Sequence, residues 1–188
     1  MSIKSLLKGT KVKLTAFMDE DIQQFKEWYN DAYFLRFYDM VAAYPQEENE
    51  IKSMIDSIRK TDKEYIFAIR TVKDNKFIGV TGFENILWNN GTSVIYIGIG
   101  RQEYRGMGYA KEALYLTMEF GFEELNLNRI QLNVIEYNQS AIALYEKLGF
   151  KREGTYREFI HRDGVRYDMY LYGILRSEWD SIHKIYQL

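Results

Sequence analysis

The sequence of 188 residues contains no cysteine, one proline and two histidines. Without cysteine, disulfides, thiolate nucleophiles and cysteine-ligated metals are excluded, and His161 and His183 alone argue against a histidine-rich metal centre. No run of about 18 apolar residues is present to span a bilayer, and the first apolar run is too short for a signal peptide. We therefore expect a cytoplasmic protein without a metal or a membrane partner, whose chemistry uses carboxylates, hydroxyls, phenols and backbone groups.

The charge is unevenly distributed. The formal net charge is −2, but residues 19–56 contain ten acidic side chains against three basic ones, Lys26, Arg36 and Lys52. Nothing resembles a basic nucleic-acid face, so we expect no nucleic-acid partner, and a cationic partner suits the acidic segment. A solvated acidic helix surface is an equally good interpretation of this segment. No linker rich in Pro, Gly or Ser divides the chain, which predicts a single domain of residues 1–188.

Apolar periodicity predicts an alternation of strands and helices. The predicted strands are 11–17, 65–71, 76–84, 92–99, 129–134, 155–161 and 165–174. The predicted helices are 22–29, 46–59, 108–124, 141–148 and 177–188, with a short helical or irregular piece around 33–38. Asp19 or Asp21 is expected to cap the first helix and Ser140 the helix 141–148, which Gly149 is expected to end. The order strand, helix, strand over 92–134 predicts a crossover and hence a parallel pair inside a mostly antiparallel sheet.

The segment 105–110, Arg-Gly-Met-Gly-Tyr-Ala, lies between a predicted strand and a predicted helix. A strand, a glycine-containing turn and a helix bring unpaired N–H groups together around one point, which indicates a phosphate site. The alternative is a flexible turn that uses glycine only to reach positive φ. The glycine spacing of a dinucleotide fingerprint and the Gly-Lys-Ser/Thr of a Walker motif are both absent, so the phosphate belongs to another ligand.

Two motifs together resemble the GNAT superfamily of acyl-CoA N-acyltransferases. They are Arg105-x-x-Gly108-x-Ala110 and Asn138-x-x-Ala141-x-x-Leu144-Tyr145-Glu146-Lys147-Leu148-Gly149-Phe150. The runs 27–31, 153–158 and 163–168 resemble its RimJ/RimL-type branch of ribosomal-protein N-terminal acetyltransferases. The resemblance extends from about residue 11 to 174. It implies an α+β fold with a mixed, mostly antiparallel sheet of roughly seven strands, a splayed central parallel pair and helices on both faces.

The resemblance also implies acetyl-CoA as cosubstrate and assigns residues to it. The pyrophosphate would be held by the backbone of Arg105, Gly106, Met107, Gly108, Tyr109 and Ala110, and the pantetheine arm would pair with Ile97, Gly98 and Ile99. Gly98 and Gly100 would let the arm approach closely, although glycine in a strand is also a common mark of an ordinary bulge. The N–H of Ile97 or Ile99 would polarise the acetyl oxygen. Asn138 would help to hold the coenzyme, although it also suits a turn. Tyr145 would protonate the departing thiolate, although it also suits the core face of a helix.

The general base is less clearly marked. Many relatives carry a glutamate ten positions before the motif arginine, where this chain has Ile95. Glu84 or Tyr96 would act through a water instead, and Glu84 is also consistent with an exposed strand end. The acidic N-terminal segment would form one wall of the acceptor cleft, where aromatic rings suit a cationic amine. These rings are Trp28, Tyr29, Tyr33, Phe34, Phe37, Tyr38, Tyr44 and Tyr96.

The leading hypothesis is an acetyl-CoA-dependent N-acetyltransferase that works by direct attack in a ternary complex. A protein N-terminus, a polyamine and an aminoglycoside all remain open as the acceptor. One alternative is a non-catalytic acyl-CoA binding or sensing module, suggested by Ile95 at the position of the family carboxylate. Another is a structural protein without a ligand. The resemblance also allows a homodimer, because many relatives are dimers.

Overall fold

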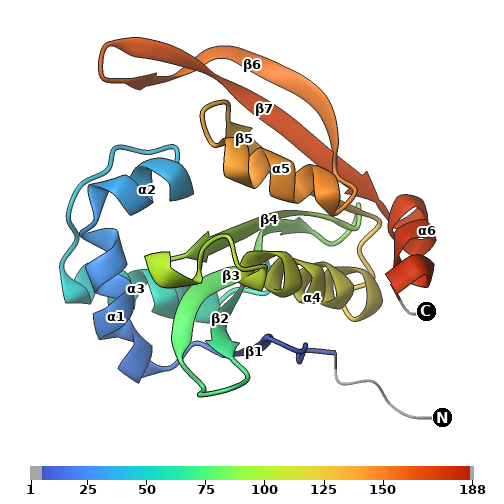
Figure 1. Ribbon diagram of the computed structural model, residues 1–188, viewed down its shortest axis with the longest axis horizontal. Helices are drawn as coiled ribbons and strands as arrows, with labels where there is room; N and C mark the ends of the chain where they lie inside the picture. The colour runs from blue at the N-terminus through green and yellow to red at the C-terminus, as the bar shows by residue number, and fades with distance from the viewer. Residues whose placement is uncertain (1–5, 187–188) are drawn as a thin grey trace.

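The fold is built on one mixed sheet, seen in the computed structural model, which describes residues 6–186 (Figure 1). Within that part of the chain the sheet has seven strands in the order β1-β2-β3-β4-β5-β7-β6. The strands are β1 Val12–Ala16, β2 Tyr65–Thr71, β3 Phe77–Leu87, β4 Thr92–Ile99, β5 Arg129–Ile135, β6 Lys151–Arg162 and β7 Val165–Leu175. Only β4 and β5 pair in parallel. The predicted mixed sheet is therefore confirmed.

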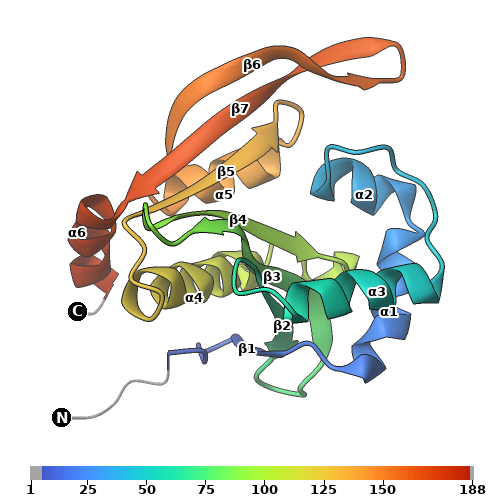
Figure 2. The ribbon, with the colours of Figure 1, turned by 180° about the vertical axis from the view of Figure 1, so that it is seen from behind.

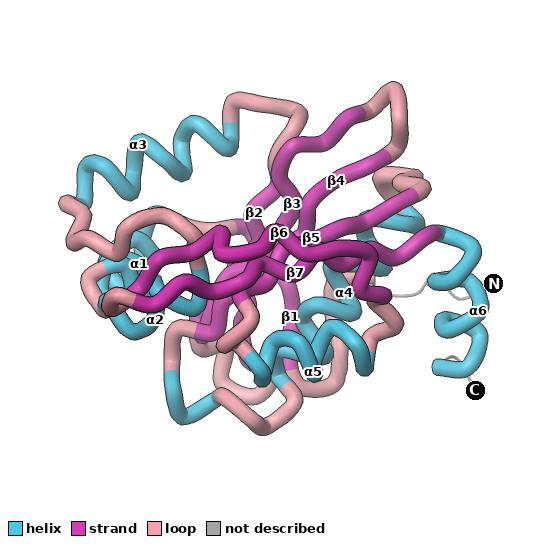
Figure 3. The backbone as a smooth tube through the Cα atoms, turned by 90° about the horizontal axis from the view of Figure 1, so that it is seen from above, coloured by secondary structure: helices cyan, strands magenta, loops and turns pink. Residues whose placement is uncertain are grey.

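Helices cover both faces of this sheet. They are α1 Ile22–Tyr29, α2 Ala32–Tyr38, α3 Glu48–Arg59, α4 Tyr109–Glu123, α5 Gln139–Lys147 and α6 Arg176–Tyr186. Buried residues of α4, α5 and α6 pack with Ile95 of β4, whereas α1, α2 and α3 pack with its neighbour Tyr96. Successive side chains of a strand point to opposite faces, so these two clusters lie on opposite sides of the sheet (Figures 2 and 3). None of the described helices is both long and apolar enough to cross a bilayer.

The central parallel pair is splayed, as the resemblance implies. β4 and β5 pair only through Thr92↔Arg129, Ser93↔Ile130 and Val94↔Gln131. Beyond this point β4 stays paired with β3 as far as Ile99, and β5 stays paired with β7 as far as Ile135. The two halves of the sheet therefore remain intact while they separate, and each leaves one strand edge without a strand partner.

Several predicted boundaries and caps differ from the structure. β3 continues through a bulge beyond Glu84 to Leu87, and β6 begins at Lys151, four residues before its predicted start. The N-cap of α5 is Asn138, whose Oδ1 accepts from the Ala141 N–H at 3.3 Å, so the prediction of Ser140 was wrong. Gly149 does end this helix, with φ of 92°. Residues 187 and 188 of the predicted last helix lie outside the described residues.

The first helix is not capped by a side chain. A 3-10 turn, Asp19–Asp21, leads into α1, and neither aspartate makes a capping hydrogen bond to it. The Asp21 carboxylate instead accepts from the Met18 N–H at 2.9 Å and pairs with Arg70 of β2. The prediction failed here because a distant cation competes for the carboxylate, and that cation is not visible in the local sequence.

Candidate active site

A cavity of about 830 Å³ opens where β4 and β5 separate. It brings together most of the residues that the sequence assigned to a site. Those lining it are Tyr29, Tyr33, Phe37, Glu84, Tyr96, Ile97, Gly98, Ile99, Arg105, Gly106, Gly108, Ala110, Asn138 and Tyr145. Trp28, Met107 and Tyr109 are not among the lining residues.

The loop from β4 to α4 forms a cradle of backbone amides. Gly106 and Gly108 have φ of 73° and 85°, in the left-handed region that favours glycine, and Gly108 is the N-cap of α4. None of the N–H groups of residues 106–110 donates to another residue within 6–186. Arg105 turns its side chain back to the end of β4, where Nε donates to the Ile99 carbonyl at 3.1 Å. Free amides at a positive helix end are suited to bind an anion.

Two lysines that sequence reasoning did not single out line the same cavity. Lys111 lies in the first turn of α4, and Lys147 is the last residue of α5. Both add positive charge to a cavity that already contains the amide cradle. Lysines on helices are usually ordinary surface residues, so only the tertiary fold distinguishes these two.

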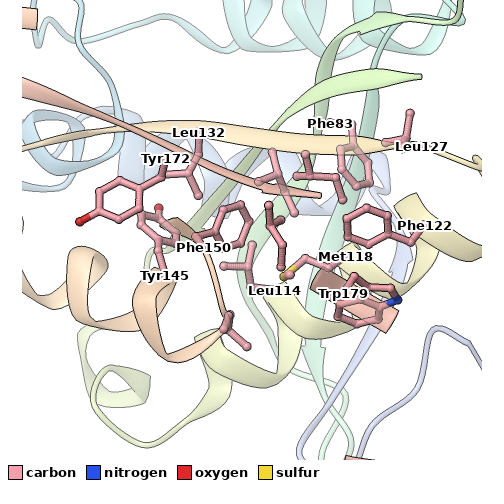
Figure 4. Packing of buried hydrophobic residues seen from close by; sticks show 14 of the residues in the cluster. Phe83, Leu114, Met118, Phe122, Leu127, Leu132, Tyr145, Phe150, Tyr172 and Trp179 are labelled. Carbon is pink, nitrogen blue, oxygen red and sulfur yellow. The ribbon is translucent and has the colours of Figure 1, made fainter. Parts of the chain in front are cut away.

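Tyr145 of α5 is both packed and part of the cavity lining. It is 9% exposed, and its ring meets Phe150 edge-on at 6.0 Å (Figure 4). No hydrogen bond within the described residues uses its hydroxyl, although that hydroxyl belongs to a cavity-lining residue. Burial raises the pKa of Tyr145 to about 12, so the phenol keeps its proton at neutral pH. The geometry therefore suits a proton donor held rigidly by the core.

Asn138 connects two helices. Its Oδ1 caps α5, and its Nδ2 donates to the Phe37 carbonyl in the last turn of α2 at 3.2 Å. The residue therefore has a structural role in addition to the cavity-lining position that was predicted for it.

Gly98 of β4 and Gly100, just after it, face aromatic rings of the N-terminal helices. A Cβ on Gly98 would lie 2.7 Å from the Tyr38 ring, and a Cβ on Gly100 would lie 1.9 Å from the Trp28 ring. The missing side chains thus make room for rings of the N-terminal helices. Trp28 is 6% exposed and packs on Phe77 at 4.8 Å, so the structure places it in the core and not in the lining of the cavity.

The two candidates for a base lie next to each other. Glu84 pairs with Val94 and Gly82 with Tyr96, so Glu84 and Tyr96 are diagonal neighbours on one face. The Tyr96 hydroxyl donates to the Tyr65 carbonyl at 3.1 Å, and burial followed by the charge of Glu84 raises its pKa well above the usual value. A phenol that keeps its proton is a poor base. Ile95, 3% exposed, lies in the core on the other face, which leaves Glu84 as the candidate.

Three carboxylates gather at this end of the cavity. Glu84 itself is exposed at the end of the regular β3 pairing, but its partial desolvation in the cavity wall, followed by repulsion from Glu64 and Asp39, raises its pKa. All three line the cavity, and none forms an ion pair with another described residue. The sequence did not single out Asp39 or Glu64 as site residues, because a carboxylate after a helix or before a strand belongs to no recognisable motif. An acidic cavity end lined by aromatic rings attracts cations.

Helix α2 and the segment after it form a bridge across the separated sheet halves at the acidic end of the cavity. Two of their carbonyls accept from the other half: Arg36 O from the Tyr137 hydroxyl at 2.5 Å and Val41 O from Arg162 at 2.7 Å. The Arg36 guanidinium also donates to Asp163 in the β6–β7 turn at 2.7 Å. Figures 1 and 2 both show this hairpin reaching toward α2. This wall of the cavity is therefore fixed to the C-terminal half of the sheet.

Comparison with known proteins gives a family match and full-length relatives. The family described as "Acetyltransferase (GNAT) domain" matches residues 11–151. The SPbeta prophage-derived uncharacterized N-acetyltransferase YokL of Bacillus subtilis is 30% identical over 93% of this chain and 96% of its own. The [ribosomal protein uS5]-alanine N-acetyltransferase of Escherichia coli is 25% identical, with 86% of each chain covered.

Solved structures share the fold. The spermidine N-acetyltransferase of Vibrio cholerae, solved in complex with CoA and spermine, has a TM-score of 0.83 to this chain. The alignment covers 91% of this chain and 99% of the Vibrio cholerae chain, at 23% sequence identity. A GNAT-family acetyltransferase from Bacillus anthracis has a TM-score of 0.77, also at 23% identity. At this identity, the likeness concerns the arrangement of the chain and not the choice of substrate.

Proposed function

Because the chain belongs to the GNAT acetyltransferase family and is an N-acetyltransferase, we propose that it transfers the acetyl group of acetyl-CoA to a primary amine of a small polycationic acceptor. The transfer proceeds by direct attack of the amine in a ternary complex, within a single domain. The observation that carries this proposal is one cavity that joins an amide cradle for an anion to an acidic, aromatic end for a cation.

Residues of this chain would hold the coenzyme along the separated strands. The free amides of residues 106–110 suit its pyrophosphate, and the edge of β4 at Ile97 and Ile99 suits its amide-containing arm, in the manner of an added strand. An N–H of this edge would polarise the acetyl carbonyl. Asn138 and Tyr145 line the opposite wall.

The chemistry is divided between two groups. The amine must lose a proton to attack, and Glu84, whose pKa is raised by partial desolvation and then by Glu64 and Asp39, would take it through a water. The departing sulfur must gain a proton, and Tyr145, which is neutral in this environment, would give it. These roles require no covalent intermediate on the enzyme.

The acceptor end favours a small amine with more than one positive charge. The reacting ammonium becomes neutral before it attacks and needs only Glu84. The additional carboxylates, Glu64 and Asp39, would therefore pair with a second ammonium of the acceptor. The bridge between α2 and the β6–β7 hairpin favours a slender chain over a folded polypeptide. The spermine in the complex of the Vibrio cholerae protein has this chemistry, whereas the acceptor named for the Escherichia coli relative is a protein alanine.

A panel of amines tests the acceptor class. With acetyl-CoA, kcat/KM for spermidine is expected to exceed that for butylamine by about tenfold, because a hydrogen bond to a charged group contributes about 1.5 kcal/mol or more. Thiol release is the measurement, and an alanine-initiated peptide and an aminoglycoside complete the panel. Turnover of the peptide without turnover of spermidine contradicts a polycationic acceptor. Tight coenzyme binding without release for any amine contradicts catalysis and favours a sensing module.

The pH dependence tests the base. A carboxylate accepts a proton only when it is ionised, so kcat/KM is expected to fall as the pH drops through the raised pKa of Glu84. Glu84→Gln is expected to lose this acidic limb and to lower kcat by about tenfold, which is below the usual range for a direct general base because the transfer passes through water. Glu64→Gln removes a repelling charge, so it should move the limb to lower pH. An unchanged profile in both variants excludes Glu84 as the base.

A further inference from the structure

The N-terminal segment wraps around a carboxylate beside the amide cradle. Glu112, in the first turn of α4, accepts from the N–H groups of Thr10, Lys11 and Val12 at 2.9, 2.7 and 2.7 Å. The Thr10 hydroxyl donates to the same carboxylate at 2.6 Å. Burial opposes ionisation of Glu112, but these hydrogen bonds outweigh it and lower its pKa. The start of β1 is thereby attached to the helix that follows the cradle.

Two further contacts fix this attachment. A Cβ on Gly9 would lie 2.5 Å from Glu112 Cδ, so a side chain at this position would push the segment away. The Lys11 carbonyl accepts from the Val72 N–H at 2.8 Å, which ties the same residue to the end of β2. The backbone of Lys11 is therefore held from both sides.

From this fixed backbone, the Lys11 side chain reaches the cradle. Its Nζ donates to the Met107 carbonyl at 2.8 Å and lies 5.8 Å from the centre of the Tyr109 ring. A Cβ on Gly108 would lie 3.3 Å from the same Nζ. The ammonium thus lies against the peptide group that joins Met107 to Gly108.

We propose that Lys11 is a positioning residue for coenzyme binding, which orients the Met107–Gly108 peptide so that the Gly108 N–H is available to the pyrophosphate. A trans peptide is planar, so a hydrogen bond that fixes its carbonyl also fixes the opposite direction of its N–H. This peptide needs such a tether because it lies between two glycines at positive φ, where the backbone is least restricted. The ammonium also polarises the peptide and adds positive charge at the start of α4.

The inference rests on the proposed function, since the anion in the cradle is taken to be the pyrophosphate of the coenzyme. A purely structural lysine would affect stability and leave coenzyme affinity unchanged. A positioning lysine would affect affinity for ligands that carry the pyrophosphate and for no others, and arginine would replace it in part because it also donates to carbonyls.

The experiment compares Lys11→Met with Lys11→Arg and with Lys73→Met, a matched loss of charge at the exposed β2–β3 turn. In Lys11→Met, the KM for acetyl-CoA and the Kd for coenzyme A by calorimetry are expected to rise about five- to tenfold, with kcat unchanged. Lys11→Arg should restore most of the affinity, and Lys73→Met should match the wild type. With S-acetylpantetheine, which lacks the pyrophosphate, Lys11→Met and the wild type should behave alike.

Two results overturn the inference. One is an unchanged Kd in Lys11→Met, and the other is an equal loss with S-acetylpantetheine, which would show a general disturbance of the site. Failure of the proposed function would give a result distinct from both, because the wild-type protein would then bind no coenzyme A at all. A fall in melting temperature without a change in Kd also assigns Lys11 to structure alone.

Discussion

Replacing Tyr145 with phenylalanine is expected to lower kcat by about 100-fold, the usual loss when a general acid is removed. The ring itself packs against Phe150 in the core and is kept in the variant, so the fold and the cavity shape should be preserved. Only the hydroxyl is lost, and it makes no hydrogen bond within the described residues. The departing sulfur would then leave as an unprotonated thiolate. Thiol release under saturating acetyl-CoA and spermidine measures the effect.

The control is Tyr172→Phe, which removes a hydroxyl from the same core cluster. Tyr172 is 2% exposed and donates to Glu146 at 2.9 Å, but it is not among the cavity-lining residues. This variant should retain kcat within about twofold, because a typical hydrogen bond contributes about 1 kcal/mol to stability and none to this transfer. The Kd for coenzyme A should be unchanged in Tyr145→Phe. Full activity in Tyr145→Phe would contradict its role as the acid and leave it as a core residue.

Local patterns in the sequence predicted the arrangement of β4, the glycine loop and α4 well. The strand, the loop with Gly106 and Gly108 and helix α4 are consecutive in the chain, so short-range signals specify their arrangement. The crossover to β5 follows from the handedness and length of such connections, and the splay agrees with the family resemblance. Tyr145 lies in a helix whose spacing was evident from residue 138 onward.

The acidic end of the cavity was predicted less well because it depends on contacts between distant segments. Glu64 and Asp39 reach Glu84 only after β2, α2 and β3 have packed together. Trp28 looked like a substrate-binding ring, but the absent side chain at Gly100, far along the chain, gives it a place in the core. Lys11 reaches Met107 across more than ninety residues of sequence. No periodicity or motif in a single sequence encodes such pairings.

Replacing Asp21 with alanine is expected to lower the free energy of unfolding by about 3–5 kcal/mol, because it leaves an unpaired buried charge. Arg70 Nη2 donates to both oxygens of Asp21, at 2.6 and 2.7 Å, and the side chains of Arg70 and Asp21 are 9% and 3% exposed. Arg70 Nε is also held by the Thr15 hydroxyl at 3.1 Å, so the guanidinium cannot simply turn to solvent. Urea unfolding followed by circular dichroism measures the loss.

Two comparisons separate this effect from the loss of any aspartate in the same turn. Asp19 pairs with Arg59 at 3.2 Å while 71% exposed, so Asp19→Ala should cost less than about 1 kcal/mol. Adding Arg70→Met to Asp21→Ala removes the stranded cation, and the double variant should regain much of the lost stability, since an apolar replacement of a buried pair is often close to neutral. If the double variant is as unstable as Asp21→Ala, the stranded charge is not the cause. The hydrogen bond from Met18 to Asp21, which holds the turn before α1, would then carry the effect.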